Sequence, residues 1–408
     1  MMSNIPKLRF PEFTGEWEEK KLSDFMTRLT RKNSNNESSR ALTISSVDGL
    51  IDQGEFFKKQ IASKDTSGYY LLKKGDFAYN KSYSVGYNYG SIKRLDRYED
   101  GVVSTLYICM SLTSDTNSDY LTHYFDSMKW NKSVSEISAE GARNHGLLNI
   151  PTEAFFQTKH FLAPSSAEQQ KIADFLSNVD SIITAETKIL NSLQKKKKAL
   201  MQKLFTQQLR FKFNDGTDFP EWEDSTLEKE CDYVDYRGKT PKKVSTGIFL
   251  VTAKNIKLGY IDYECSKEYI AENDYNEVMH RGKVKLGDVL ITTEAPCGNV
   301  AQIDNENVAL AQRVIKYSSK GRLNNTFLKY YFLSDLFRTI INEKATGSTV
   351  KGIKGSVLHK QKVIVPSLEE QQKIADCLSS LDSLIQNQQK VVTTWQQRKK
   401  ALLQQMFI

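Results

Sequence analysis

The chain has 408 residues, of which 39% are hydrophobic and 26% charged, a globular composition with length for two or three domains. No run of the sequence approaches the roughly 18 apolar residues that a spanning helix needs, and residues 1–13 lack a signal-peptide core, so we expect no membrane partner and a cytoplasmic location. The net charge of +8 suits a polyanionic partner without identifying one.

The first region, residues 1–165, has the pattern of a compact mixed α/β domain. It opens with the triplet Leu-Arg-Phe at 8–10 and with Glu-Trp-Glu at 16–18. Short β-rich runs follow, among them residues 77–80 and 102–110, and a Gly75-Asp76 turn precedes the first of these. The order of the strands cannot be derived from this pattern.

Residues 166–208 predict one long helix. Pro164 fixes the backbone before it, Ser165 or Ser166 can cap it, and Glu168 lies in the first turn, where the helix dipole favours an anion. Apolar residues then recur at alternating spacings of four and three, which is typical of a coiled-coil seam. They are Ile172, Leu176, Val179, Ile183, Leu190, Leu193, Leu200 and Leu204. In the lysine run 195–198 only Lys197 falls on this seam, which favours a solvated helix face over a DNA contact.

The second region, residues 209–367, follows the same plan. Leu-Arg-Phe recurs at 209–211, Glu-Trp-Glu at 221–223, and a Gly287-Asp288 turn precedes a β-rich run at 289–293. Residues 247–251 and 285–293 predict strands, and residues 324–342 predict a helix. Elsewhere the two regions share only scattered positions, so we expect two related folds with different surfaces.

Residues 368–408 predict a second long helix. Residues 364–407 align with 162–205 without a gap, and about half the positions are identical, which defines an internal repeat. Antiparallel pairing of the two helices is favoured, because a parallel pair would oppose Lys197 to Lys399. The antiparallel alignment sets Glu186 against Lys399 and Lys197 against Gln388. The second seam consists of Ile374, Leu378, Leu381, Ile385, Val392, Trp395, Leu402 and Met406.

These patterns predict an α/β mixed (α+β) fold, in which two globular domains are joined by two long antiparallel coiled-coil helices with a pseudo-two-fold internal repeat. Motifs for chemistry are missing from the sequence. The triplet Gly238-Lys239-Thr240 has Tyr233 where a phosphate loop needs its first glycine, and no G-x-G-x-x-G, H-x-x-x-H or G-x-S-x-G is present. The five cysteines form no C-x-x-C pair and predict reduced, mostly buried thiols; they are Cys109, Cys231, Cys265, Cys297 and Cys377.

Two diverged domains, each followed by a helix that opens P-S-x-x-E-Q-Q-K-I-A-D, closely resemble the specificity subunits of type I restriction-modification enzymes. The match rests on Pro164 with residues 168–172, Pro366 with residues 370–374, the two Leu-Arg-Phe segments and the Gly-Asp turns. The resemblance implies a non-catalytic subunit with two target-recognition domains (1–165 and 209–367) and two spacer helices (166–208 and 368–408). Each domain would read one half of a split, asymmetric sequence in double-stranded DNA.

The same resemblance implies partners that do the chemistry. The repeated helices would fix the gap between half-sites and hold two modification (methyltransferase) subunits, with restriction (endonuclease and translocase) subunits in the full complex. S-adenosylmethionine, ATP and Mg would bind to those partners, and we expect no catalytic, cofactor or metal site in this chain. Two alternative functions are a self-contained DNA nuclease or methyltransferase, and a structural coiled-coil adaptor.

Base readout needs Arg, Lys, Asn, Gln, Ser or Thr at base edges, and phosphate contact needs cations on exposed loops. Polar loops of this kind lie after the Gly-Asp strands and between glycines, and Glu294 can also accept a hydrogen bond from cytosine. The candidates are Asn80, Lys81, Ser82 and Tyr83; Arg143, Asn144 and His145; Thr292, Thr293 and Glu294; Gln312 and Arg313; and Ser348, Thr349, Lys351 and Lys354.

Overall fold

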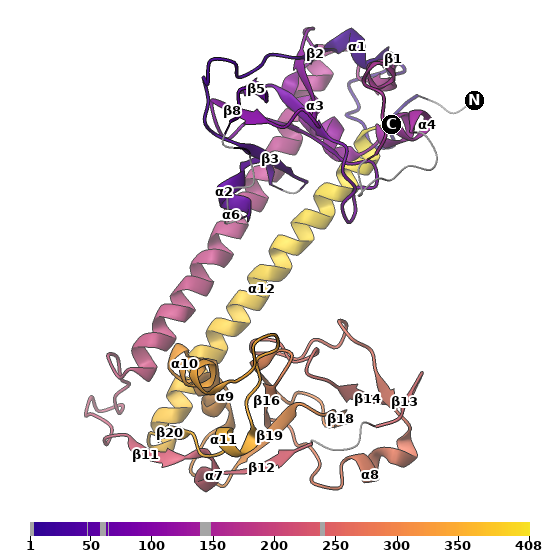
Figure 1. Cartoon of the computed structure of the whole chain (residues 1–408). Coiled ribbons are helices and arrows are strands. Elements are labelled where there is room, and N and C mark those ends of the chain that lie inside the picture. Colours follow the sequence, from indigo (N-terminus) through magenta and orange to yellow (C-terminus); the bar gives the residue numbers. More distant parts are fainter. Residues whose placement is uncertain (1–3, 47, 58–62, 64, 139–147, 237–240) are drawn as a thin grey trace. The chain divides into compact units, whose positions relative to one another are not determined.

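The computed structural model describes residues 4–408 except 47, 58–62, 64, 139–147 and 237–240. The chain divides into two compact units: unit 1 is Met1–Thr187 with Lys390–Ile408, and unit 2 is Lys188–Gln389. Each unit holds one globular region and part of each of two long helices, α6 and α12 (Figure 1). Both boundaries fall at equivalent points of the repeat, since Thr187 aligns with Gln389.

Unit 1 is built on a four-stranded antiparallel sheet in the order β2-β9-β6-β7. Phe77, Ala78 and Tyr79 of β6 are all buried, so both faces of this strand are covered. Helix α3 packs against β7. The elements are β2 (Met26–Leu29), β6 (Phe77–Asn80), β7 (Ser91–Arg94), β9 (Ile108–Leu112) and α3 (Ser118–Ser127); the pairs β1 (Glu18–Lys21) with β10 (Lys159–Leu162), β3 (Leu42–Ser45) with β4 (Gly49–Asp52) and β5 (Tyr70–Lys73) with β8 (Asp100–Val103); and α1 (Leu22–Phe25), α2 (Gln53–Phe57), α4 (Asn131–Ile137) and α5 (Thr152–Phe156).

Unit 2 repeats the main sheet in the order β12-β19-β16-β17 and adds a second four-stranded sheet, β13-β15-β14-β18. Helix α9 packs against β17 as α3 does against β7. The elements are β12 (Cys231–Asp235), β16 (Val289–Thr293), β17 (Cys297–Gln302), β19 (Val314–Ser319), β13 (Lys243–Val244), β14 (Ile248–Val251), β15 (Tyr269–Ile270) and β18 (Val308–Leu310); the pair β11 (Glu223–Thr226) with β20 (Lys362–Val365); and α7 (Leu227–Glu230), η1 (Glu272–Asp274), α8 (Tyr275–Val278), α9 (Asn325–Leu333), α10 (Asp335–Lys344) and α11 (Gly355–Leu358).

The Gly-Asp turns precede the central strands, as the sequence predicts. The carboxylate of Asp76 accepts hydrogen bonds from the backbone amide of Lys73 and from Ser111 Oγ on β9, both at 2.7 Å. It therefore closes the turn before β6 and ties that turn to the neighbouring strand. Asp288 makes the equivalent bonds at the turn before β16 and is 2% exposed.

The long helices α6 (Ser166–Phe205) and α12 (Leu368–Met406) begin and end close to the predicted residues. Every predicted seam residue is buried or half-buried, and of residues 195–198 only Lys197 is not exposed. Each helix ends inside the core of the unit in which the other begins: Phe407 packs on Trp17, Tyr120 and Tyr124, and Phe205 packs on Phe327. The helices are thus antiparallel.

Three predictions need correction. Residues 102–110 form two strands, β8 and β9, because a turn in which the Tyr107 amide bonds to the Ser104 carbonyl separates them. Residues 324–342 form two helices, because the Ser334 side chain caps α10 by accepting from the Phe337 amide. Only two cysteines are buried, Cys109 and Cys231, while Cys265 is exposed. None of the described helices is long and apolar enough to cross a membrane.

Candidate DNA interface

A clamp made by three side chains holds the start of each long helix. In unit 1, Arg9 donates two hydrogen bonds to the Glu168 carboxylate, at 2.7 and 2.8 Å, and Trp17 Nε1 donates a third at 3.2 Å. Glu168 is 1% exposed, and these hydrogen bonds compensate the cost of burying its carboxylate. In unit 2, Arg210 and Trp222 bind Glu370 in the same way, at distances between 2.8 and 3.1 Å. These clamps explain why the Leu-Arg-Phe, Glu-Trp-Glu and P-S-x-x-E segments recur together.

The two glutamines after each clamp glutamate attach the long helix to the sheet-packing helix. Gln169 accepts from the Asn117 amide at 2.9 Å and donates to the Ala163 carbonyl at 2.7 Å, while Gln170 accepts from the Asn117 side chain. Asn117 is the N-cap of α3. In unit 2, Gln371 and Gln372 make the same contacts with Asn324, the N-cap of α9. The E-Q-Q triplet therefore fixes α3 and α9, and with them the main sheets.

A lysine from one helix and an aspartate from the other join the helices within each unit. In unit 1, Lys399 Nζ lies 2.7 Å from Asp180, and in unit 2 Lys197 binds Asp382. The two pairs are equivalent in the repeat. The predicted direction is therefore correct, but the predicted register is wrong by six residues, since Lys399 opposes Asp180 and not Glu186. The seam residues alone predict the wrong register, because each lysine pairs with an aspartate one position beside the seam.

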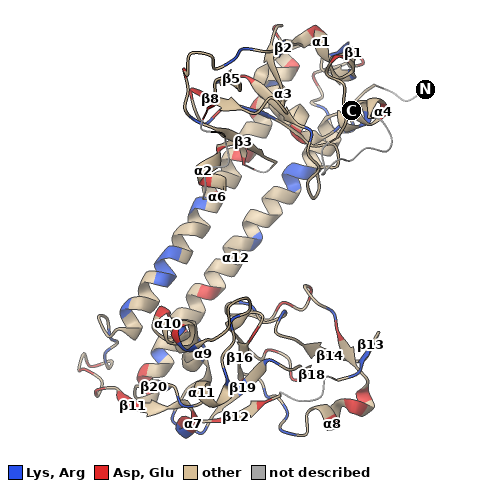
Figure 2. Cartoon of the chain, viewed as in Figure 1, with Lys and Arg blue, Asp and Glu red and all other residues tan. Residues whose placement is uncertain are grey.

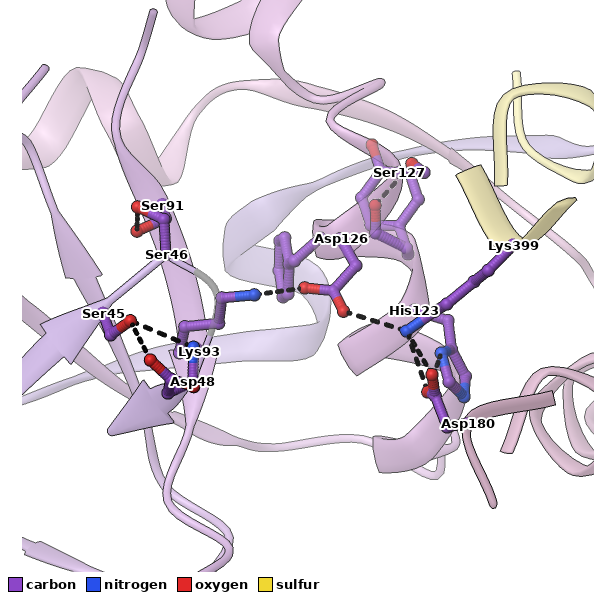
Figure 3. Close-up of polar contacts among 12 residues, drawn as sticks. Ser45, Ser46, Asp48, Ser91, Lys93, His123, Asp126, Ser127, Asp180 and Lys399 are labelled. Atoms are coloured by element: carbon purple, nitrogen blue, oxygen red, sulfur yellow. Dashed lines mark hydrogen bonds and ion pairs between the residues drawn. The ribbon is translucent and has the colours of Figure 1, made fainter. Parts of the chain in front are cut away.

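The junction in unit 1 contains additional charged groups (Figure 3). Asp126 on α3 lies 3.7 Å from Lys399 and 2.6 Å from Lys93 on β7. His123 is buried, and burial, together with the nearby Lys399, lowers the pKa of its imidazole. In unit 2, Tyr330 takes the place of His123, and its hydroxyl donates to Asp382 at 2.6 Å. Both units thus share the Lys-Asp pair between the long helices, while the residue packed against it differs.

In unit 2 the structure brings three predicted DNA-contact segments together where the central strands β16 and β19 meet their loops, a place we call the loop edge of the main sheet. The Thr293 amide donates to the Arg313 carbonyl, and the Ile353 amide donates to the Thr293 carbonyl, both at 2.9 Å. Glu294 also pairs with Gly352 in a β-bridge. The loop 346–352 is closed by two hydrogen bonds between Thr346 and Gly352. This edge exposes Arg313, Ser348, Thr349, Lys351 and Lys354, and Gln312 and Glu294 are half-buried.

The equivalent edge of unit 1 carries the segment 80–83. The Leu148 amide donates to the Lys81 carbonyl at 3.0 Å, as Ile353 does to Thr293. Tyr83 is 47% exposed, whereas Lys81 is half-buried, and burial lowers the pKa of its ammonium group. Asn80 accepts from the Ser82 amide and so shapes the turn. Arg143, Asn144 and His145, which are three to five residues before Leu148, lie outside the described residues, as does the 238–240 triplet.

Two predicted contact residues of unit 2, Thr292 and Thr293, are not at the surface of its loop edge. At the equivalent edge of unit 1, the exposed residue Leu106 was not predicted. The side chains of Thr292 and Thr293 are 0% and 5% exposed, and the Thr292 hydroxyl accepts from the Asn299 amide. Burial therefore keeps both side chains away from a DNA surface. Leu106, which lines one small pocket with Lys81, is 59% exposed. The sequence did not indicate Leu106 as a contact residue, because an isolated leucine between turn residues is common on protein surfaces.

Charge is distributed rather than concentrated. Figure 2 shows basic and acidic residues interspersed along the loops and helices of both units. Arg313, Lys351 and Lys354 are exposed cations on the loops of unit 2. Within the described part of the chain, no group of three or more His, Cys, Asp or Glu residues is arranged to hold a metal ion.

Comparison with known proteins agrees with this duplicated plan. Residues 14–195 and 220–394 each match the family described as type I restriction modification DNA specificity domain. The type I restriction enzyme MjaVIII specificity subunit of Methanocaldococcus jannaschii is 27% identical over 317 residues, which cover 74% of this chain and 72% of that protein. The putative MjaX specificity subunit of the same organism is 26% identical over 423 residues, covering 98% and 95% of the two chains.

Solved structures share the fold over the whole chain. The type I restriction-modification S subunit from M. genitalium covers 99% of both chains with a TM-score of 0.56 at 13% identity. A chain from a structural study of assembly and conformational transition in the type I R-M system covers 96% of this chain and 97% of its own, with a TM-score of 0.54 at 17% identity.

The duplicated domain and its repeated clamps define a two-domain DNA specificity protein. The chain belongs to the family of type I restriction-modification specificity subunits. Members of this family are the non-catalytic, DNA-recognising components of their systems, which agrees with the expectation of a chain without an active site.

Proposed function

We propose that each unit binds double-stranded DNA through the loop edge of its main sheet and reads one half of a bipartite, asymmetric target. The target-recognition domains would be residues 1–165 and 209–367, and the spacer helices would be 166–208 and 368–408. The observation that carries this proposal is the shared backbone at the two edges. The Lys81 and Thr293 carbonyls accept equivalent hydrogen bonds, yet the side chains around them differ.

In unit 2 the interface would consist of Glu294, Gln312, Arg313, Ser348, Thr349, Lys351 and Lys354, and in unit 1 of Asn80, Lys81, Ser82 and Tyr83 with Arg143, Asn144 and His145. Lysines on these loops would neutralise phosphates, while arginine and amide side chains would contact bases. The target is a duplex, because the major groove presents a distinct pattern of donors and acceptors for every base pair.

We further propose that the repeated helices hold two modification subunits, and that restriction subunits join the assembled complex. Two helices with the same repeated sequence pattern suit two copies of one partner. S-adenosylmethionine, ATP and Mg would then bind to those partners, which carry out methyl transfer and cleavage. This assignment is supported by family membership.

A selection experiment tests the proposed reading. The chain, assembled with its modification subunits, is incubated with a pool of random duplexes, and the bound DNA is sequenced. We expect two short constant blocks separated by a gap of unspecified bases, and binding that weakens steeply with salt as counterions are released. Enrichment of one continuous block, or of no sequence at all, would contradict the proposal.

A further inference from the structure

Arg313 occupies an unusual backbone position at the edge of the unit 2 sheet. Its φ of +68° lies in the left-handed region, which residues other than glycine, asparagine and aspartate rarely adopt. Its carbonyl accepts a hydrogen bond from the Thr293 amide, and the next residue, Val314, is fully buried. The hydrogen bond and this burial together fix the backbone at Arg313. Strained backbone of this kind is found preferentially at functional sites.

Glu294 orients the Arg313 side chain. A carboxylate oxygen of Glu294 lies 3.3 Å from Arg313 Nε, and the side chains are 42% and 53% exposed. An ion pair this exposed contributes little to folding stability, so stability does not explain a charged pair on strained backbone. The guanidinium has five N–H donors, more than one carboxylate accepts, and its fork matches two acceptors placed side by side.

The neighbouring loop supplies contacts of another kind. Residues 346–352 are closed on themselves and joined to Glu294 through Gly352, and they expose Ser348, Thr349 and Lys351. Hydroxyls and an ammonium group on an exposed loop suit phosphate oxygens. Arg313 therefore projects from a fixed sheet edge beside a phosphate-binding type of loop.

Unit 1 has different side chains at the same points of the sheet. Tyr79 of β6 pairs with Ile108, and Ile291 of β16 pairs with Ile315, so two residues before each partner Leu106 corresponds to Arg313. The position of Glu294 is held by Ser82, six residues after Asp76 as Glu294 is after Asp288. Equivalent positions of the two main sheets thus carry an oriented cation, Arg313, in unit 2 and an exposed apolar side chain, Leu106, in unit 1.

We propose that Arg313 is the residue of unit 2 that reads a guanine in the major groove, donating to its O6 and N7, and that Glu294 is the positioning residue for this contact. The inference rests on the proposed function and deepens it by naming a base. A pinned, half-exposed guanidinium fits a bidentate contact to guanine, because guanine presents two acceptors side by side, whereas adenine has an N6 amino donor beside its N7 acceptor.

The test measures binding of the assembled complex to its selected target and to duplexes that each change one base pair. Arg313→Ala should abolish discrimination at one G·C position of one half-site, a loss of roughly 5- to 150-fold in preference, while the other half-site is read as before. Arg313→Lys should restore part of the overall affinity and only part of this preference, because the flexible ammonium group lacks the planar fork that fits O6 and N7 together. Glu294→Gln should weaken the preference at the same position.

Lys351→Ala is the matched control, and it should weaken binding to all sequences with a shallower dependence on salt. Unchanged reading of the other half-site shows that each variant is folded and assembled. If Arg313→Ala behaves like Lys351→Ala, or changes no preference, the inference is overturned although the bipartite reading stands. If the unaltered chain selects no bipartite target, the proposed function itself fails.

Discussion

Glu168 shows how a single residue of the repeated motif ties a long helix to its domain. Its carboxylate is almost completely buried and accepts from Arg9 and Trp17. Glu168→Ala leaves both donors without their acceptor, and we expect unit 1 to lose about 3–5 kcal/mol of unfolding free energy. Denaturant titration followed by hydrogen exchange in unit 1 peptides measures this loss.

The control for this prediction is Glu19→Ala. Glu19 pairs with Lys159 on the surface of the same unit, where both side chains are well exposed. Removing this pair should change the stability of unit 1 very little, because solvent screens exposed ion pairs. Equal losses in the two variants would show that the clamp is not a buried ion pair in solution.

His160 predicts a pH dependence of the stability of unit 1. Burial lowers the pKa of its imidazole to about 3, and its ring nitrogens lie 2.8 Å from the hydroxyls of Tyr124 and Thr158. Between about pH 6.5 and 3 the unfolded state binds a proton that the folded state does not, so stability is fully present above pH 6.5 and falls on acidification. The slope from this group is at most about 1.4 kcal/mol per pH unit.

His160→Gln should flatten this slope in hydrogen-exchange measurements at pH 7.5 and 5.5. Some slope should remain, because burial lowers the pKa of His123 in the same direction. His280→Gln, a change in unit 2, serves as the control and should leave the pH dependence of unit 1 unaltered. A variant without His160 that loses stability as steeply as the unaltered chain would refute the assignment.

At the scale of elements, the register of the helices can be tested with charge reversal. Lys399 lies against Asp180, so Lys399→Glu places two like charges together and should destabilise unit 1. Asp180→Lys restores opposite charges and should recover part of the loss, giving a favourable coupling energy of roughly 0.5–3 kcal/mol in a double-mutant cycle. Glu186→Lys, the partner that the sequence suggested, should give no such recovery. Rescue by Glu186→Lys instead would contradict the register in the structure.

The elements differ in how far the sequence determines them. The two long helices and their antiparallel direction follow from the proline and serine signals at 164–166 and from a seam that repeats over the whole helix. The register does not, because it depends on where Lys197 and Lys399 direct their flexible ends, and Asp180 and Asp382 lie one position beside the seam. The break between β8 and β9 and the break at Ser334 are likewise decided by local hydrogen bonds.

The candidate interface was predictable only as separate segments. Residues 294, 313 and 352 are far apart in the sequence, and their convergence depends on the order β12-β19-β16-β17, which no local pattern encodes. Burial of Thr292 and Thr293 was also hidden, because threonine fits a strand interior and an exposed edge equally well. The residues of the clamps, by contrast, were visible as repeats, although their contact with each other was not.

For the whole molecule, the repeat separates what is constant from what varies. The clamps, the E-Q-Q contacts and the Lys-Asp pairs are duplicated, while the edge side chains, such as Arg313 against Leu106, are not. A chain built in this way can change one reading surface without disturbing the other. We therefore expect each unit to read its own half of the DNA target independently of the other.

Exchange of one unit's globular region tests this claim most directly. Residues 209–365 are replaced by the corresponding region of a relative with a different target, keeping both long helices, and methylated positions are mapped across the host genome. We expect one half of the methylated sequence to change to that of the donor and the other half to stay as it was. A change in both halves, or retention of the original sequence in both, would contradict separate reading by the two units.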